Sequence, residues 1–196
     1  MNAQLNSFVV ADPKKCIGCR ACEIACAVAH YDKEIKTVGC LDRPLISRLY
    51  LVKTAEVTMP VQCHHCENAP CVKSCTAKCI EYQDNKILID EERCIGCKSC
   101  ILACPFGAIE LIISPCEIEK KNLLSMNTGG KENSSQAVVA SKCDLCTRRS
   151  QGPACVEVCS QQALRYVDFY TERKRRQSEA AQAIGAFVES FRGQEG

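Results

Sequence analysis

The sequence predicts an α+β fold of tandem small units, one inserted in the other, with small antiparallel sheets, short helices and a helix at the C-terminal end. Two observations predict it. Sixteen of the 19 cysteines fall into four groups of four, which recur along the chain at regular intervals. The 196 residues include no Trp, five Phe and five Tyr, so an ordinary aromatic-rich core is thin. We therefore expect groups bound to the cysteines to hold the fold together.

The four Cys groups share a tight spacing. The first and third follow C-x2-C-x2-C-x3-C, the second C-x2-C-x4-C-x3-C and the fourth C-x2-C-x8-C-x3-C. They span Cys16–Cys26, Cys63–Cys75, Cys94–Cys104 and Cys143–Cys159. Three thiolates on one turning loop can reach three corners of an iron–sulfur cubane, while the fourth Cys points to another cluster. The groups therefore predict four 4Fe-4S clusters.

Zinc is the alternative for C-x2-C pairs. A zinc site needs four ligands, usually supplied as two separated pairs. Here every group carries a third and a fourth Cys at close spacing, which tetrahedral zinc does not require. The spacing therefore favours iron–sulfur clusters over zinc.

The chain also carries an internal duplication. The segment Lys15–Cys22 (KCIGCRAC) is echoed by Arg93–Cys100 (RCIGCKSC). The group that begins at Cys63 is echoed by the group that begins at Cys143. Both echoes lie roughly 80 residues downstream. Two copies of a repeat are too few for a solenoid fold.

Distance along the chain predicts which groups exchange their fourth Cys. The second and third groups lie about 30 residues apart, a compact ferredoxin length, and the first and fourth pair by exclusion. The four predicted ligand sets are Cys63, Cys66, Cys71 and Cys104; Cys75, Cys94, Cys97 and Cys100; Cys16, Cys19, Cys22 and Cys159; and Cys26, Cys143, Cys146 and Cys155. The central unit, residues 60–112, is thus inserted into an outer unit of residues 1–59 and 113–170, and residues 171–196 form a helical tail.

Short strands are expected beside the Cys groups. The β-rich runs are residues 8–10, 46–52, 87–89, 108–112, 138–139 and 163–167, and residues 83–85 are typical of a turn. We expect short helices to begin near each fourth Cys, with Pro105 in a first helical turn. Residues 125–136 predict an exposed loop.

Residues 172–192 predict an amphipathic helix. Its apolar side chains recur at helical spacing: Ala180, Ile184, Phe187, Val188 and Phe191. This stripe packs either on its own subunit or on a partner subunit or a second copy of the complex. The basic run Arg173–Arg176 is typical of a solvated helix face.

Three cysteines, Cys40, Cys79 and Cys116, are surplus to the groups, and each is expected to be a small buried side chain. Cys79 competes with Cys75 as a candidate ligand, but the shared x3 spacing favours Cys75. His64 and His65 lie inside a ligand loop. A Rieske centre is not expected, because Cys already fills the four ligand positions.

Arg20 and Lys98 occupy matching positions inside two cluster loops. Each is either a solvated charge or a cation that favours the reduced form of the neighbouring cluster and so raises its potential.

Charge and composition exclude several functions. The formal net charge is +2, but four clusters with thiolate ligands would bring it to about −6, so binding to nucleic acid is not expected. Neither a secretory signal nor a membrane-spanning run is visible, and a reduced, cytoplasmic location is expected. No Gly-rich nucleotide loop or Ser-His-Asp constellation is present, so no substrate chemistry is expected.

The pattern over about residues 5–168 resembles the four-cluster ferredoxin-type subunits of molybdopterin oxidoreductases, and in particular the branch that serves formate dehydrogenases and formate-linked hydrogenases. The resemblance is carried by Cys63–Cys71 (CHHCENAPC), Lys142–Cys146 (KCDLC) and Gly152–Cys155 (GPAC). The chain departs from the family pattern at Thr76 and Ser160, where the family usually has Pro.

The resemblance implies a non-catalytic electron-transfer subunit. Its partners would be a formate dehydrogenase or iron hydrogenase subunit, and other ferredoxin-like subunits, as in formate hydrogenlyase or hydrogen-dependent carbon dioxide reductase. The alternative is a free polyferredoxin or an accessory shuttle between separate enzymes.

Overall fold

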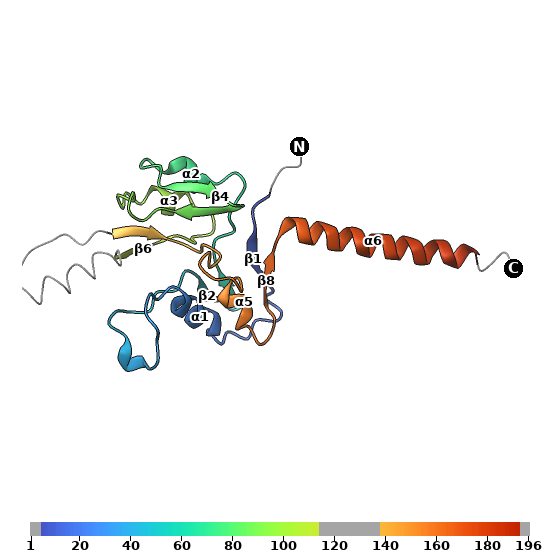
Figure 1. The fold of residues 1–196 in the computed structure, drawn as a ribbon, viewed down its shortest axis with the longest axis horizontal. Coiled ribbons are helices and arrows are strands. Elements are labelled where there is room, and N and C mark those ends of the chain that lie inside the picture. The colour runs from blue at the N-terminus through green and yellow to red at the C-terminus, as the bar shows by residue number, and fades with distance from the viewer. Residues whose placement is uncertain (1–4, 114–137, 193–196) are drawn as a thin grey trace, which may run out of the picture.

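The computed structural model describes residues 5–113 and 138–192, with side chains described as far as residue 189. Within these ranges, the strands form four two-stranded antiparallel sheets (Figure 1). The pairs are β1 (Phe8–Ala11) with β8 (Leu164–Val167), β2 (Tyr50–Lys53) with β3 (Thr58–Val61), β4 (Ile80–Gln83) with β5 (Lys86–Ile89), and β6 (Glu110–Ile113) with β7 (Val138–Ser141). The α-helices are α1 (Ala21–Ala29), α2 (Pro70–Ser74), α3 (Ser99–Ala103), α5 (Ala154–Glu157) and α6 (Phe169–Arg192), and a 3-10 turn covers Val38–Cys40.

Most of the predicted strands are confirmed, but two strands were not predicted. β2 begins at Tyr50 rather than at residue 46, and the short strands β3 and β4 lie outside the predicted runs. The predicted turn at residues 83–85 is confirmed. Asp84 and Asn85 have φ values of 48° and 61°, which is the left-handed conformation that a two-residue hairpin loop requires. The predicted loop at residues 125–136 lies outside the described residues.

The prediction that helices begin near each fourth Cys was wrong. Cys75 and Cys104 cap the C-terminal ends of α2 and α3, and Cys26 lies within α1. The third and fourth Cys of each group are four residues apart, so one helical turn places both on one face. Pro105 follows the end of α3 instead of starting a helix, because Pro cannot continue one.

The helices pack in two pairs, α1 with α5 and α2 with α3. The pairs therefore join the first Cys group to the fourth and the second to the third. Two hairpins connect the predicted units: β2–β3 crosses the boundary at residues 59 and 60, and β6–β7 joins residues 110–113 to 138–141. Figure 1 shows the segment with α2, α3 and β4 lying beside the segment with α1, α5 and β2. The insertion of one unit into the other stays a prediction.

The buried core has two parts, and cysteines contribute to both. One contains Val9, Leu49 and Leu164 around cysteines of the first and fourth groups, together with Cys63. The other contains Ile80 and Ile87 around Cys71, Cys79 and Cys100. The apolar side chains therefore surround the thiols rather than forming a separate core.

Two hairpins approach the Cys loops closely at Gly18 and Gly96. Both glycines have positive φ, 73° and 65°. A Cβ added at Gly96 would lie 2.5 Å from the carbonyl oxygen of Val138 in β7, and one added at Gly18 would lie 3.0 Å from the Thr58 side chain in β3. Close packing of hairpin on loop therefore requires glycine at these positions.

We expect Gly96→Ala to destabilise the protein more than Gly107→Ala. Gly107 also has positive φ, 58°, but an added Cβ there meets nothing within 4 Å. Alanine at Gly107 should cost about 1–2 kcal/mol for the left-handed conformation. At Gly96, displacement of β7 should add about 1–3 kcal/mol. Thermal denaturation of both cluster-loaded variants measures the difference, and equal losses would show that β7 does not press on the Cys loop.

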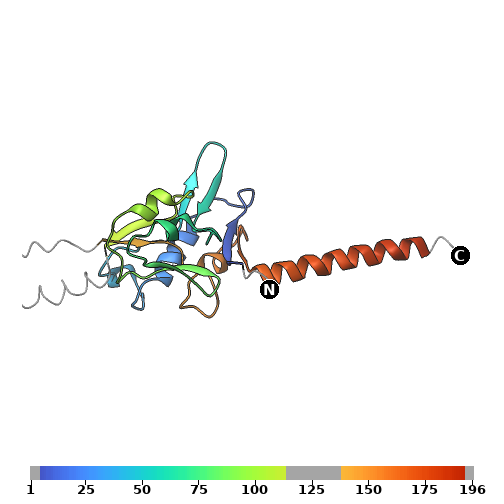
Figure 2. The same cartoon turned by 90° about the horizontal axis from the view of Figure 1, so that it is seen from above.

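The C-terminal helix α6 begins earlier than predicted and projects from the body. The Asp168 carboxylate accepts a hydrogen bond from the Thr171 N–H at 2.9 Å, an N-cap that starts the helix at Phe169. Figures 1 and 2 show α6 extending away from the rest of the chain in both views. Ile184 is 63% exposed and Val188 45% exposed. These two side chains therefore do not pack on the body of their own chain.

Candidate metal centre

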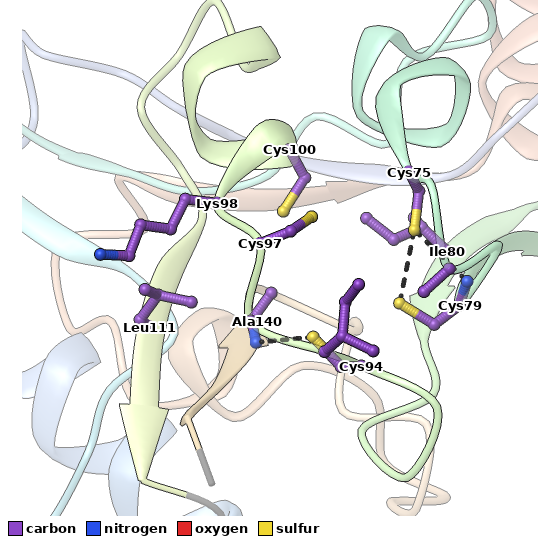
Figure 3. A pocket seen from close by; sticks show the side chains of 12 residues that line it. Cys75, Cys79, Ile80, Cys94, Cys97, Lys98, Cys100, Leu111 and Ala140 are labelled. Atoms are coloured by element: carbon purple, nitrogen blue, oxygen red, sulfur yellow. Dashed lines mark hydrogen bonds between the residues drawn. The ribbon is translucent and has the colours of Figure 1, made fainter.

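One predicted ligand set lines a cavity between α2 and α3 (Figure 3). Cys75 comes from the end of α2, while Cys94, Cys97 and Cys100 come from the loop before α3 and its first turn. Figure 3 shows the sulfur atoms of these residues facing a shared space. We call these four residues the Cys97 set.

A second predicted set lines a similar cavity beside α1. Its cysteines are Cys16, Cys19, Cys22 and Cys159, which we call the Cys19 set. The first three come from the loop before α1 and its first turn, and Cys159 follows α5, which packs on α1. Thiols from opposite ends of the sequence are thus brought together at one site.

Most cysteines of the two remaining predicted sets are buried, and their thiols influence one another electrostatically. Charge on Cys63 and Cys104 raises the pKa of both Cys66 and Cys71, secondary to burial. Likewise, charge on Cys26 and Cys146 adds to burial in raising the pKa of Cys155. We call Cys63, Cys66, Cys71 and Cys104 the Cys66 set, and Cys26, Cys143, Cys146 and Cys155 the Cys146 set.

The fourth Cys of three groups accepts a backbone hydrogen bond from the residue four positions later. Cys79 donates to Cys75 Sγ at 3.3 Å, Ala108 to Cys104 Sγ at 3.4 Å, and Ala163 to Cys159 Sγ at 3.2 Å. These three donor residues are buried. Cys79 therefore occupies a position that alanine fills elsewhere, which favours Cys75 as the ligand even though the Cys79 sulfur lies only 3.4 Å from Cys75 Sγ.

Burial keeps many of the thiols protonated in the absence of a bound cation. It raises the pKa of Cys71 to about 11, with Cys63 adding to the shift, and the pKa of Cys155 to about 12, with Cys26 adding to it. Burial also raises the pKa of Cys22 to about 11. Because thiolate is the ligand form, cluster assembly must displace these protons. Several thiolates this close together need the positive charge of a bound metal.

A charged network that sequence reasoning missed supports the Cys146 set. His30 Nδ1 lies 2.7 Å from the Cys26 carbonyl oxygen and 3.8 Å from Cys26 Sγ, and its Nε2 lies 2.9 Å from an Asp144 carboxylate oxygen. Arg48 pairs with Asp144 at 3.0 Å, and its backbone N–H donates to Cys26 Sγ at 3.3 Å. Burial opposes protonation of His30, but the bonds to Asp144 and Cys26 raise its pKa to about 9. His30 lies four residues after Cys26, at the position of Cys79, Ala108 and Ala163, and that spacing was the available signal.

The two histidines of the second group have packing roles. His65 is buried, and its Nδ1 accepts a hydrogen bond from the Ile87 N–H at 2.9 Å. Burial, followed by the charge of Lys142, lowers the His65 pKa to about 3. The His64 ring stacks on Phe106 at 4.2 Å between centroids.

The surplus cysteines differ in their surroundings. The prediction that Cys40 is buried was wrong, because it is exposed in the turn Val38–Cys40. Cys79 is buried as predicted, and Cys116 lies outside the described residues. Arg20 and Lys98 lie in left-handed conformation immediately before α1 and α3, with φ of 62° and 69°.

The donor set fits 4Fe-4S clusters. Each set supplies four thiols, and backbone N–H groups point at the sulfur atoms of Cys26, Cys75, Cys94, Cys104 and Cys159. Amide donors of this kind are the usual outer-shell partners of cluster thiolates. Such sites suit one-electron transfer. Within the described ranges, none of the helices combines the length and the apolar character that crossing a membrane requires.

Known proteins are similar to this chain in sequence. Two models described as a 4Fe-4S binding domain match residues 13–29 and 87–110. In Escherichia coli (strain K12), the electron transport protein HydN is 35% identical over 84% of this chain and 89% of its own length. Hydrogenase-4 component A is 40% identical over 83% of both chains. The protein UacF, named an oxidoreductase, is 41% identical over 84% of this chain, which spans only 22% of UacF.

Proposed function

From the premise that the chain belongs to the family of 4Fe-4S ferredoxin-type electron-transfer proteins, we propose that it carries four clusters and conducts electrons between a catalytic subunit and a redox partner. The observation that supports this most strongly is that the Cys97 set and the Cys19 set each line a cavity, while the cysteines of the other two predicted sets lie close enough to shift one another's pKa. We propose that each set holds one cluster. When bound, such a cluster accepts and releases single electrons.

The four sets support a continuous path through the chain. Cys19 and Cys97 are exposed, so their sets lie at the surface, whereas most cysteines of the other sets are buried. Cys22 influences the titration of Cys155, and both Cys26 and Cys63 influence that of Cys143. The packing of α2 on α3 connects the Cys66 set to the Cys97 set. We propose the order Cys19 set, Cys146 set, Cys66 set, Cys97 set.

We propose that the chain has no substrate chemistry of its own and acts in the cytoplasm. Hydrogenase-4 component A is a relative, which favours a hydrogenase subunit as the catalytic partner. We propose an iron hydrogenase or formate dehydrogenase subunit in this role, with other ferredoxin-like subunits as further partners. The name of HydN, an electron transport protein, favours the second candidate, a shuttle between separate enzymes.

Anaerobic purification of the tagged native protein separates these two functions. A chain that is a subunit of a stable electron-transfer complex should co-purify with a larger catalytic subunit. Addition of formate or hydrogen should then bleach the cluster absorbance within the isolated complex. A chain that purifies alone and is reduced only when a separate enzyme is added would instead be a shuttle. Cluster-loaded chain that neither source reduces in either setting would contradict both functions.

We further propose that α6 mediates association with a partner subunit or with another copy of the complex. Its exposed Ile184 and Val188 would contribute about 1.5–3 kcal/mol each if fully buried at an interface. The helix also has no role in the ligand sets, because Cys159 is the last cysteine of the chain.

Removal of residues 172–196 should therefore leave the iron content unchanged and reduce the size of the assembly. Size-exclusion chromatography with light scattering measures the assembly, and iron analysis is the control. A double variant, Ile184→Ser with Val188→Ser, should reproduce the effect without shortening the chain. An assembly of unchanged size in both variants would mean that α6 is not an association surface.

A further inference from the structure

The two surface sets are built alike, so their differences can be compared position by position. In each, a hairpin covers the cavity with one residue from each strand, paired in register. Leu51 and Pro60 line the Cys19 cavity, and Leu111 and Ala140 line the Cys97 cavity. The loops also match, because a hairpin approaches closely at a glycine of positive φ in each, Gly18 and Gly96.

The first difference is a backbone hydrogen-bond donor. The Ala140 N–H donates to Cys94 Sγ at 3.4 Å in the Cys97 set. Pro60 occupies the corresponding hairpin position over the Cys19 set, and Pro has no N–H to donate. The Cys97 set therefore has a donor that the matching position of the Cys19 set lacks.

The second difference is a fixed negative charge. Glu23 lies one residue after Cys22, and its carboxylate accepts the Leu51 N–H at 2.7 Å, which ties it to the hairpin over the Cys19 set. The corresponding residue after Cys100 is Ile101. An anion therefore lies beside the Cys19 set, although Arg20 at 3.7 Å offsets part of its charge, and an apolar side chain takes its place beside the Cys97 set.

The third difference is a hydroxyl group. The Cys97 thiol donates to Ser99 Oγ at 3.5 Å; a ligating thiolate has no proton, so the hydroxyl would then donate to the sulfur instead. Ala21 occupies the position of Ser99 in the Cys19 set. Two other features match and so do not contribute to a difference. Cys19 and Cys97 are both exposed, and the fourth Cys of each set accepts a similar backbone hydrogen bond.

All three differences act in the same direction. Reduction adds one negative charge to a cluster and its thiolates. Hydrogen-bond donors stabilise that charge, and a fixed anion destabilises it. From Pro60, Glu23 and Ala140, we infer that the cluster of the Cys97 set has a higher reduction potential than the cluster of the Cys19 set. Electron flow from the Cys19 end to the Cys97 end is then favourable. This inference rests on the proposed function.

Reciprocal variants test the inference in the full-length, anaerobically purified chain. Pro60→Ala adds the missing N–H, and Glu23→Gln removes the charge while keeping a carbonyl acceptor for Leu51. Both variants should raise the reduction potential of the same single cluster. At a fixed ambient potential, the ratio of reduced to oxidised cluster should change about fivefold, which is the effect of one ordinary net hydrogen bond. Redox titration followed by electron paramagnetic resonance measures the four potentials.

Two further variants identify the cluster of the Cys97 set. Ala140→Pro should lower the potential of a different cluster by a similar factor, because the Pro ring replaces an N–H that points away from the β6–β7 ladder. Ser99→Ala, which copies Ala21, should lower the same potential and covers the case in which Ala140→Pro does not fold. Ala140→Gly keeps the N–H and is the control, with no shift expected.

The wild-type order decides the outcome. In the wild-type chain, the cluster whose potential is lowered by Ser99→Ala or Ala140→Pro should have a higher reduction potential than the cluster whose potential is raised by Pro60→Ala and Glu23→Gln. The inference holds if this order is found. The opposite order, or no shift in any of these variants, overturns it. A wild-type chain that binds fewer than four clusters would instead contradict the proposed function, so the two failures are distinguishable.

Discussion

Removing the iron is expected to unfold most of the chain. Both parts of the core are assembled around thiols, and the sheets have only two strands each, an arrangement that is marginal alone in water. Without clusters, the buried space around Cys71 and Cys155 holds protonated thiols and loses the bonds that tie distant segments together. We therefore expect loss of essentially the whole stability, about 5–15 kcal/mol for a domain.

Amide dispersion in nuclear magnetic resonance spectra tests this after chelation of iron under anaerobic, reducing conditions. Residues of β1 and β8 are the best reporters, because the Cys19 set joins Cys16 near β1 to Cys159 near β8. Residual helical signal from α6 is compatible with unfolding, since that helix does not rest on the core. Reconstitution with iron and sulfide should restore the dispersion. A well-dispersed, cooperatively melting apo-protein would contradict the expectation.

Cys104→Ser is expected to remove one cluster of the four. Cys104 caps the end of α3, and its charge acts on Cys66 and Cys71 across the helix pair. The cluster held by the Cys66 set should therefore be lost or weakened, and the iron content should fall by about a quarter. The cluster of the Cys97 set should be less affected, although Cys104 follows Cys100 in the sequence.

Cys79→Ala is the matched control for this variant. Cys79 is a buried cysteine beside the Cys97 set, and alanine occupies its position in two other groups. Its replacement should leave the iron content unchanged, whereas Cys75→Ala should lower it. Spectroscopic loss confined to the cluster of the Cys97 set in Cys104→Ser would show that the exchange of the fourth Cys is wrong.

The ligand sets could be predicted from the sequence because Cys spacing is a local property with a geometric consequence, and they stay a prediction. The α1–α5 and α2–α3 pairs agree with the pairing expected from chain distance. Helix ends were misjudged for a local reason as well. The x3 spacing marks one turn shared by the third and fourth Cys, and the prediction placed that turn after the fourth Cys rather than before it.

Features that depend on distant segments could not be predicted. The hairpins β2–β3 and β6–β7 connect the predicted units, and β3 contains a Pro that discourages a strand assignment from sequence. The network of His30, Arg48 and Asp144 joins three segments of the chain. Only His30 has a spacing signal in the sequence, because it lies four residues after Cys26. The exposure of Cys40 likewise follows from the course of a loop, which composition does not determine.

Iron, acid-labile sulfide and zinc per chain, measured together on anaerobically purified protein, test the central claim most directly. Four sets of four thiols predict about sixteen iron and about sixteen sulfide per chain, with zinc near zero. Mössbauer spectra of the same sample should assign the iron to 4Fe-4S clusters. About half that iron, with zinc making up the balance, would contradict the four-cluster account.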